Sequence, residues 1–123
     1  MFAIVANPRV RWAVILAAVI VIAGLGLMPS TPATVFLSGS AMHILGFAGL
    51  ATVALLCWPG IDVLLLWTGI SLFGGSIELL QAAMHVGREA EWADVACNCA
   101  SAAATILLLR AGGAFLRGRW LSA

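Results

Sequence analysis

Four long apolar stretches restrict the folds open to this sequence. They cover residues 12–28, 42–58, 61–84 and 95–111. An α-helix needs about 20 apolar residues to cross the ~30 Å hydrocarbon core of a membrane, and each stretch comes close to that length. Charged residues make up only 9% of the chain, against roughly 25% in soluble domains. The stretches are therefore predicted to be membrane-spanning helices.

The alternative is a soluble helical bundle, in which each helix would need a polar face. Residues 12–26 contain no charged, hydroxyl or amide side chain. Turn-forming residues at 29–32 and 59–60 separate the first three stretches, and recurring glycine and alanine allow close helix packing. We predict an all-α polytopic membrane protein with one domain over 1–123, folded as an antiparallel four-helix bundle.

The arginines predict the orientation of the spans. Five of them flank the first and last stretches: Arg9, Arg11, Arg110, Arg117 and Arg119. Arg88 stands between the third and fourth stretches. Because basic residues favour the cytoplasmic side, both termini are expected in the cytoplasm, with 29–41 and 85–94 outside. A cleaved signal peptide would leave three spans, but the first apolar run exceeds the usual core of about 7–15 residues.

Polar side chains lie along one face of two predicted helices. On the third stretch the spacing is 4, 3, 3 and 4 residues, and on the fourth it is 4, 3 and 4. The residues are Ser71, Gly75, Glu78, Gln81 and His85 on the third, and Asp94, Asn98, Ser101 and Thr105 on the fourth. These intervals place side chains on one helix face. Since polar groups in lipid are costly, both faces are expected to point inward.

The predicted site lies in the outer half of the bundle. Six residues are expected to converge there: His43, Glu78, Gln81, Arg88, Asp94 and Asn98. Glu78 is about 10 Å below the outer surface by helix rise. It is a candidate general base or proton relay together with His43, or else a neutral, hydrogen-bonded carboxyl group.

The remaining site residues each have a structural and a functional interpretation. Arg88 and Asp94 form a salt bridge, with Asp94 capping the fourth helix, or Arg88 holds a phosphate or carboxylate of a ligand. Asn98 and Gln81 form an amide pair between helices or contribute to ligand binding.

No metal site or cofactor is expected. Cys97 and Cys99 lie two residues apart on a predicted helix and lack the spacing of metal ligands. Catalytic fingerprints such as G-x-S-x-G, H-E-x-x-H and the phosphate loop do not occur. The net charge of +1 comes with arginines too dispersed for a nucleic-acid partner.

The motif spacing resembles that of the VanZ-like proteins. Glu78 and Gln81 match E-x-x-Q, and Arg88, Asp94 and Asn98 match R-x5-D-x3-N. His43 corresponds to the histidine that opens the family's second span, although Gly39-Ser40 replaces a frequent Asp-Lys pair. The resemblance implies a small multi-spanning protein of the bacterial inner membrane and cell envelope. The family's namesake is associated with low-level teicoplanin resistance.

These features together predict an outward-facing polar pocket that binds an anionic envelope component or a partner, surrounded by membrane lipids. An enzyme acting on a lipid-linked or peptidoglycan substrate is the first alternative, with Glu78 or His43 as base and Arg88 as electrostatic clamp. A structural subunit of a larger membrane complex is the second, since short spans with small-residue faces suit helix association.

Overall fold

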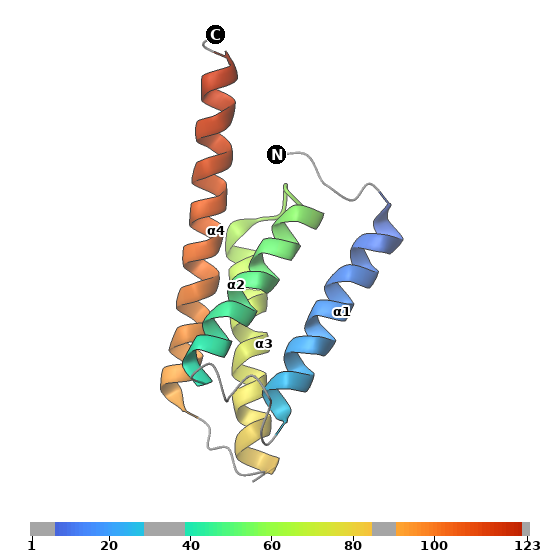
Figure 1. Cartoon of the computed structure of the whole chain (residues 1–123), viewed down its shortest axis with the longest axis vertical. Coiled ribbons are helices and arrows are strands. Elements are labelled where there is room, and N and C mark those ends of the chain that lie inside the picture. Colours follow the sequence, from blue (N-terminus) through green and yellow to red (C-terminus); the bar gives the residue numbers. More distant parts are fainter. Residues whose placement is uncertain (1–6, 29–38, 85–90, 122–123) are drawn as a thin grey trace.

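The computed structural model describes residues 7–28, 39–84 and 91–121, and these form four helices (Figure 1). They are α1 (Pro8–Leu27), α2 (Gly39–Cys57), α3 (Val63–Met84) and α4 (Trp92–Leu121). Each is long and apolar enough to cross a membrane, counting Trp92–Phe115 of α4. The prediction of an all-helical chain with four such helices is confirmed.

The helix boundaries differ from the predicted ones: α1, α2 and α4 start before their apolar stretches, whereas α3 starts two residues after residue 61. α1 begins at Pro8 because the Asn7 side chain accepts a hydrogen bond from the Arg9 amide at 2.9 Å, and proline suits a first helical turn. α3 begins at Val63, where the Asp62 carboxylate accepts from the Leu65 amide at 2.8 Å. α4 continues to Leu121, beyond the apolar stretch that ended at residue 111.

Three of the helices form the core of the described chain. α4 packs against α2 and α3, whereas α1 packs only against α2 and α3 and has no buried residue. In Figure 1, α1 and α4 lie on opposite sides of this core. The core side chains include Phe47, Leu50, Leu55, Ile70, Ala102 and Ile106. The arrangement is a three-helix core with α1 along one side.

The outer surface of the helices is apolar. Leu64, Leu72 and Leu108 are each about two-thirds exposed or more, and α1 exposes Leu16 and Ile20 in the same way. Soluble monomers rarely expose contiguous apolar surface on this scale. Hydrocarbon is the solvent that suits such a surface.

One end of the helices is held together by Arg110 of α4. Its Nη1 donates to the Pro59 carbonyl at 2.7 Å, and its Nη2 donates to the Ile61 carbonyl. At the same end, the Trp12 and Trp58 rings pack with centroids 5.0 Å apart. The beginning of α1, the α2–α3 turn and α4 therefore meet at this end.

α3 and α4 are in close contact at Gly74. A Cβ added there would lie 2.9 Å from Asn98 Nδ2, 3.0 Å from a carbon of the Phe47 ring and 3.1 Å from Asn98 Cβ. Gly75, the next residue, has open space at the same position. Gly74 thus allows Asn98 to pack directly against the α3 backbone.

These two neighbours form a matched pair for a stability measurement. We expect Gly74→Ala to reduce the free energy of unfolding by about 1–3 kcal/mol, because it forces extra volume into a filled site. Gly75→Ala should be neutral or stabilising by up to about 1 kcal/mol, because alanine is the better helix former. Denaturant titration in detergent micelles measures both. Equal stabilities for the two variants would contradict the close approach of α3 and α4.

Candidate functional site

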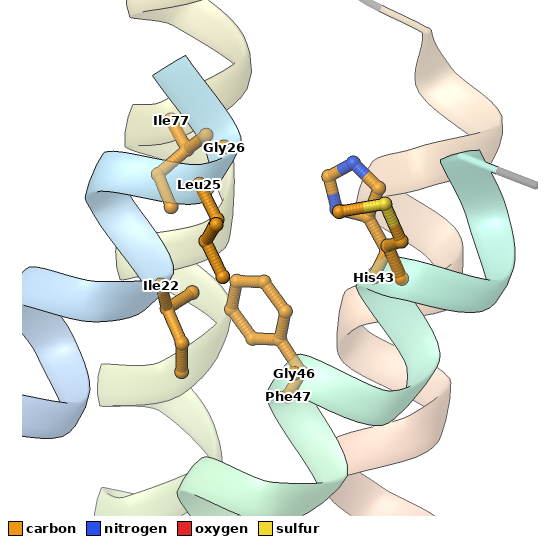
Figure 2. A pocket seen from close by; sticks show the side chains of 8 residues that line it. Ile22, Leu25, Gly26, His43, Gly46, Phe47 and Ile77 are labelled. Atoms are coloured by element: carbon orange, nitrogen blue, oxygen red, sulfur yellow. The ribbon is translucent and has the colours of Figure 1, made fainter. Parts of the chain in front are cut away.

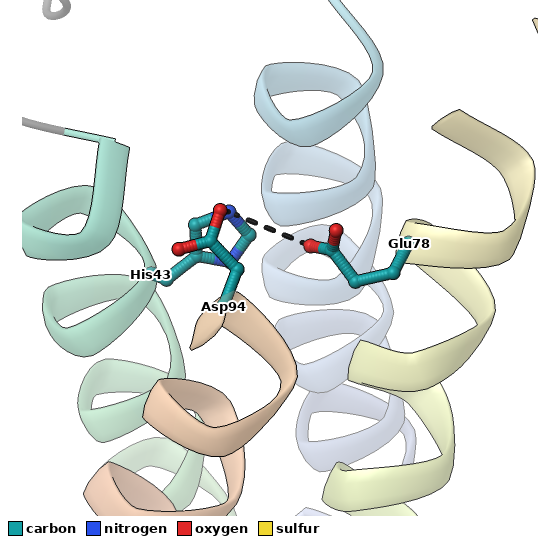
Figure 3. A group of neighbouring side chains, drawn as sticks. All are labelled: His43, Glu78 and Asp94. Carbon is teal, nitrogen blue, oxygen red and sulfur yellow. Dashed lines mark ion pairs between the residues drawn. The ribbon is translucent and has the colours of Figure 1, made fainter. Parts of the chain in front are cut away.

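Four buried polar side chains from three helices meet at the end of the core opposite Arg110. They are His43 of α2, Glu78 of α3, and Asp94 and Asn98 of α4, and we call them the polar cluster. Figure 3 shows His43, Glu78 and Asp94 pointing toward one another. Their exposed fractions are 7%, 4% and 9%, and that of Asn98 is 0%. Ionisable side chains are rarely buried to this degree unless they are paired.

Helix periodicity brings these residues together. Asp94 and Asn98 are four residues apart, so α4 presents both on one face. On α2, Phe47 lies one turn after His43, and the two rings stack at an interplanar angle of 12°. Phe47 is 2% exposed and belongs to the apolar core. The imidazole is therefore held between the core and the polar groups.

His43 contacts the other three members of the cluster. Its Nδ1 lies 2.9 Å from Asn98 Oδ1, and its Nε2 lies 3.3 Å from Asp94 Oδ2 and 3.6 Å from Glu78 Oε1. An amide oxygen is only an acceptor, so Nδ1 donates its proton to Asn98. This bond fixes the ring so that Nε2 faces both carboxyl groups.

The second oxygen of each carboxyl group is also engaged. The Ser40 hydroxyl donates to Asp94 Oδ1 at 3.2 Å, and the Glu91 backbone amide donates to Glu78 Oε2 at 3.4 Å. Ser40 stands one turn before His43 on α2. These contacts direct Oδ2 and Oε1 toward the imidazole.

Gln81 bonds to α1 and Asn98 bonds to His43, so the expected amide pair between Gln81 and Asn98 is wrong. Its Nε2 donates to the Gly26 carbonyl of α1 at 2.7 Å. Gly26 lies in the last turn of α1, where carbonyl groups have no partner within the helix. The buried amide of Gln81 satisfies one of these carbonyls and attaches α1 to α3.

Asp94 also differs from its predicted role. α4 begins at Trp92, which puts Asp94 inside the first turn, and its side chain contacts Ser40 and His43 instead of capping the helix. The contacts of Asp94 with Ser40 and His43 thus take the place of the predicted capping bond. Arg88 lies outside the described residues, so its salt bridge with Asp94 stays a prediction.

The structure thus brings together four of the six candidate residues. Sequence spacing missed Ser40 and Gly26 as partners, because both contacts join helices far apart in the chain. It also missed a donor set for a metal ion: His43, Glu78 and Asp94 each offer one ligand atom, and these atoms lie within 4.8 Å of one another. The cysteines considered for that role, Cys97 and Cys99, are free thiols.

A small apolar cavity of about 60 Å³ lies beside His43. Figure 2 shows its lining, contributed by α1, α2 and α3. Ile22 and Leu25 of α1 and Phe47 of α2 are among these residues. His43 therefore belongs both to the polar cluster and to the wall of an apolar cavity.

No protein-family model matches the chain, and searches of the curated proteins and of the solved structures found no match. The VanZ-like resemblance remains a prediction from motif spacing.

The bond between His43 and Asn98 can be measured by a double-mutant cycle. We expect His43→Ala and Asn98→Ala to be non-additive, with a coupling energy of about 0.6–2 kcal/mol, the range for hydrogen bonds between membrane helices. Ser101→Ala is the matched control, because the Ser101 hydroxyl bonds to the Asn98 carbonyl of its own helix. Its effect should add to that of His43→Ala. Additive effects of His43→Ala and Asn98→Ala would contradict the hydrogen bond between His43 of α2 and Asn98 of α4.

Proposed function

We propose that this chain is a multi-pass protein of the bacterial inner membrane that binds an anionic, lipid-linked component of the cell envelope at the polar cluster. The observation that carries the proposal is the position of His43. Its ring joins a buried group of ionisable side chains to an apolar cavity beside α1. A ligand whose polar head adjoins an apolar segment would contact both environments at His43.

An antiparallel arrangement of four spans with both termini in the cytoplasm belongs to the same proposal. Among the described residues, Arg9, Arg11 and Arg110 lie at the end that contains the α2–α3 turn. Glu78 and Asp94 lie at the other end. Basic residues favour the cytoplasm, so the polar cluster would face outward.

The VanZ-like resemblance supports an envelope role. The residues that carry it on α2, α3 and α4 include all four members of the polar cluster. In this proposal the guanidinium group of Arg88 binds the anionic head of the ligand. Its planar arrangement of N–H donors matches a phosphate or a carboxylate.

A catalytic role on the same ligand is the second candidate. His43 Nε2 lies beside two carboxyl groups, at 3.3 Å and 3.6 Å. A histidine oriented by one partner and adjacent to carboxyl groups can accept a proton from a bound substrate. His43 or Glu78 would then act as the base in an enzyme acting on a lipid-linked or peptidoglycan substrate.

Ligand retention tests the binding proposal. Native mass spectrometry of protein purified in mild detergent should show a bound anionic lipid in excess of its share of the membrane. His43→Ala should lose most of this lipid, because it removes the residue shared by the cluster and the cavity. Asp62→Asn is the matched control: it changes an exposed carboxylate at the far end and keeps an oxygen that can cap α3.

Circular dichroism and elution volume establish that each variant is folded. Wild-type protein that carries no anionic lipid above background would contradict the proposal. Equal retention by folded His43→Ala would also contradict it. Retention of a protein partner in place of a lipid would favour the structural-subunit interpretation.

A further inference from the structure

The three ionisable residues of the polar cluster have the composition of a metal site. An imidazole nitrogen and two carboxylate oxygens come from three different helices and converge at one point (Figure 3). All three residues are buried. Nitrogen and oxygen donors of this kind bind divalent transition metals such as zinc.

The distances from His43 Nε2 to the two carboxylate oxygens are those between ligands to one ion. His43 Nε2 lies 3.3 Å from Asp94 Oδ2 and 3.6 Å from Glu78 Oε1. Both separations exceed the about 2.7–3.2 Å of ordinary N–H···O hydrogen bonds. Two ligands held about 2.0–2.2 Å from a tetrahedral zinc ion lie about 3.3–3.6 Å apart. Both separations from His43 Nε2 fall in this range, and the ligand oxygens of Glu78 and Asp94 lie within 4.8 Å of each other.

Asn98 orients the imidazole as partners of metal ligands do. Metal-bound histidines usually donate the other ring N–H to an oxygen, which fixes the tautomer. His43 does this with Asn98 Oδ1 at 2.9 Å, leaving Nε2 toward the carboxylates. Asn98 is completely buried, and its Nδ2 has no hydrogen-bond partner in the described part of the chain. Its buried amide therefore serves His43 through the oxygen alone.

The charge of the complex suits an apolar environment. A divalent cation bound by two carboxylates and a neutral imidazole has a total charge of zero, so the metal-bound group buries no net charge.

We propose that His43, Glu78 and Asp94 bind one divalent transition-metal ion, for which Zn²⁺ is the probe. Three protein ligands leave a fourth coordination position open, as in zinc sites that bind a water molecule or a substrate oxygen. Asp94 is the most exposed of the three, with 12% of its side chain accessible. A water molecule or a substrate would therefore reach the ion from the side of Asp94.

The metal site deepens the proposed function, because a cation would offer its open position to the anionic head. The assignment of the anionic head as the fourth ligand rests on the proposed function. The site itself rests on the geometry of the three residues. The measurements below detect bound zinc and not bound lipid, so their outcome is separate from that of lipid retention.

Metal binding is measured on tag-free, detergent-purified protein that has been stripped with a chelator. Isothermal titration with Zn²⁺ should give one tight site per chain, and zinc should raise the thermal unfolding temperature. X-ray absorption at the zinc edge should show one imidazole and oxygen ligands without sulfur. Replacing Cys57, Cys97 and Cys99 with alanine should leave the stoichiometry unchanged.

Isosteric variants identify the ligands. Glu78→Gln and Asp94→Asn each replace an anionic ligand with an amide, and zinc affinity should fall by at least about 100-fold, more than for an outer-shell residue. Asn98→Ala should weaken binding by about 10–100-fold as a positioning residue. Asp62→Asn, the remote carboxylate control, should bind as the wild type does.

Several results would overturn the site. If the folded wild-type protein binds no zinc, the metal site is excluded, and no variant is needed for that conclusion. Sulfur ligation would assign the zinc to cysteine, and unchanged affinity in folded Glu78→Gln and Asp94→Asn would assign it to other residues. Lipid retention with no zinc bound would leave the proposed function standing and refute the metal site. Zinc binding by a protein that retains no lipid would do the reverse.

Discussion

The hydrogen bond from His43 Nδ1 to Asn98 Oδ1 determines the geometry of the polar cluster. It joins α2 to α4, and it decides which ring nitrogen faces Glu78 and Asp94. Gly74 lets Asn98 reach this position, since a side chain there would overlap the asparagine amide. The cluster thus depends on one small residue of α3 and one amide of α4 as much as on its ionisable groups.

The two ends of the helices differ in chemistry. At one end Arg110 donates to the carbonyl groups of the α2–α3 turn, and Trp12 packs on Trp58. At the other end a histidine, two carboxyl groups and an amide form the buried polar cluster. Gln81 attaches α1 at this second end through the Gly26 carbonyl. α1 has no buried residue of its own, so this bond contributes to holding it beside the cavity next to His43.

Periodicity in the sequence accounts for much of this structure. Four apolar stretches predicted the helices, and the 4- and 3-residue intervals predicted that Glu78, Asp94 and Asn98 lie on inward faces. Spacing within one helix does not determine the partner on another helix. Gln81 was therefore assigned to Asn98 although it bonds to α1, and Asp94 was assigned to a cap although it bonds to Ser40. The donor set of His43, Glu78 and Asp94 was missed for the same reason, because its three members come from three helices.

The protonation state of His43 tests the account most directly. The chain has two histidines, so His85→Gln leaves His43 as the only one, and ¹⁵N-labelled imidazole can be observed in micelles by NMR. We predict a proton on Nδ1 in the folded protein, with added Zn²⁺ shifting Nε2 and leaving the Nδ1 proton in place. A bare Nδ1 with the proton on Nε2, unchanged by Zn²⁺, would contradict both the Asn98 bond and the metal site.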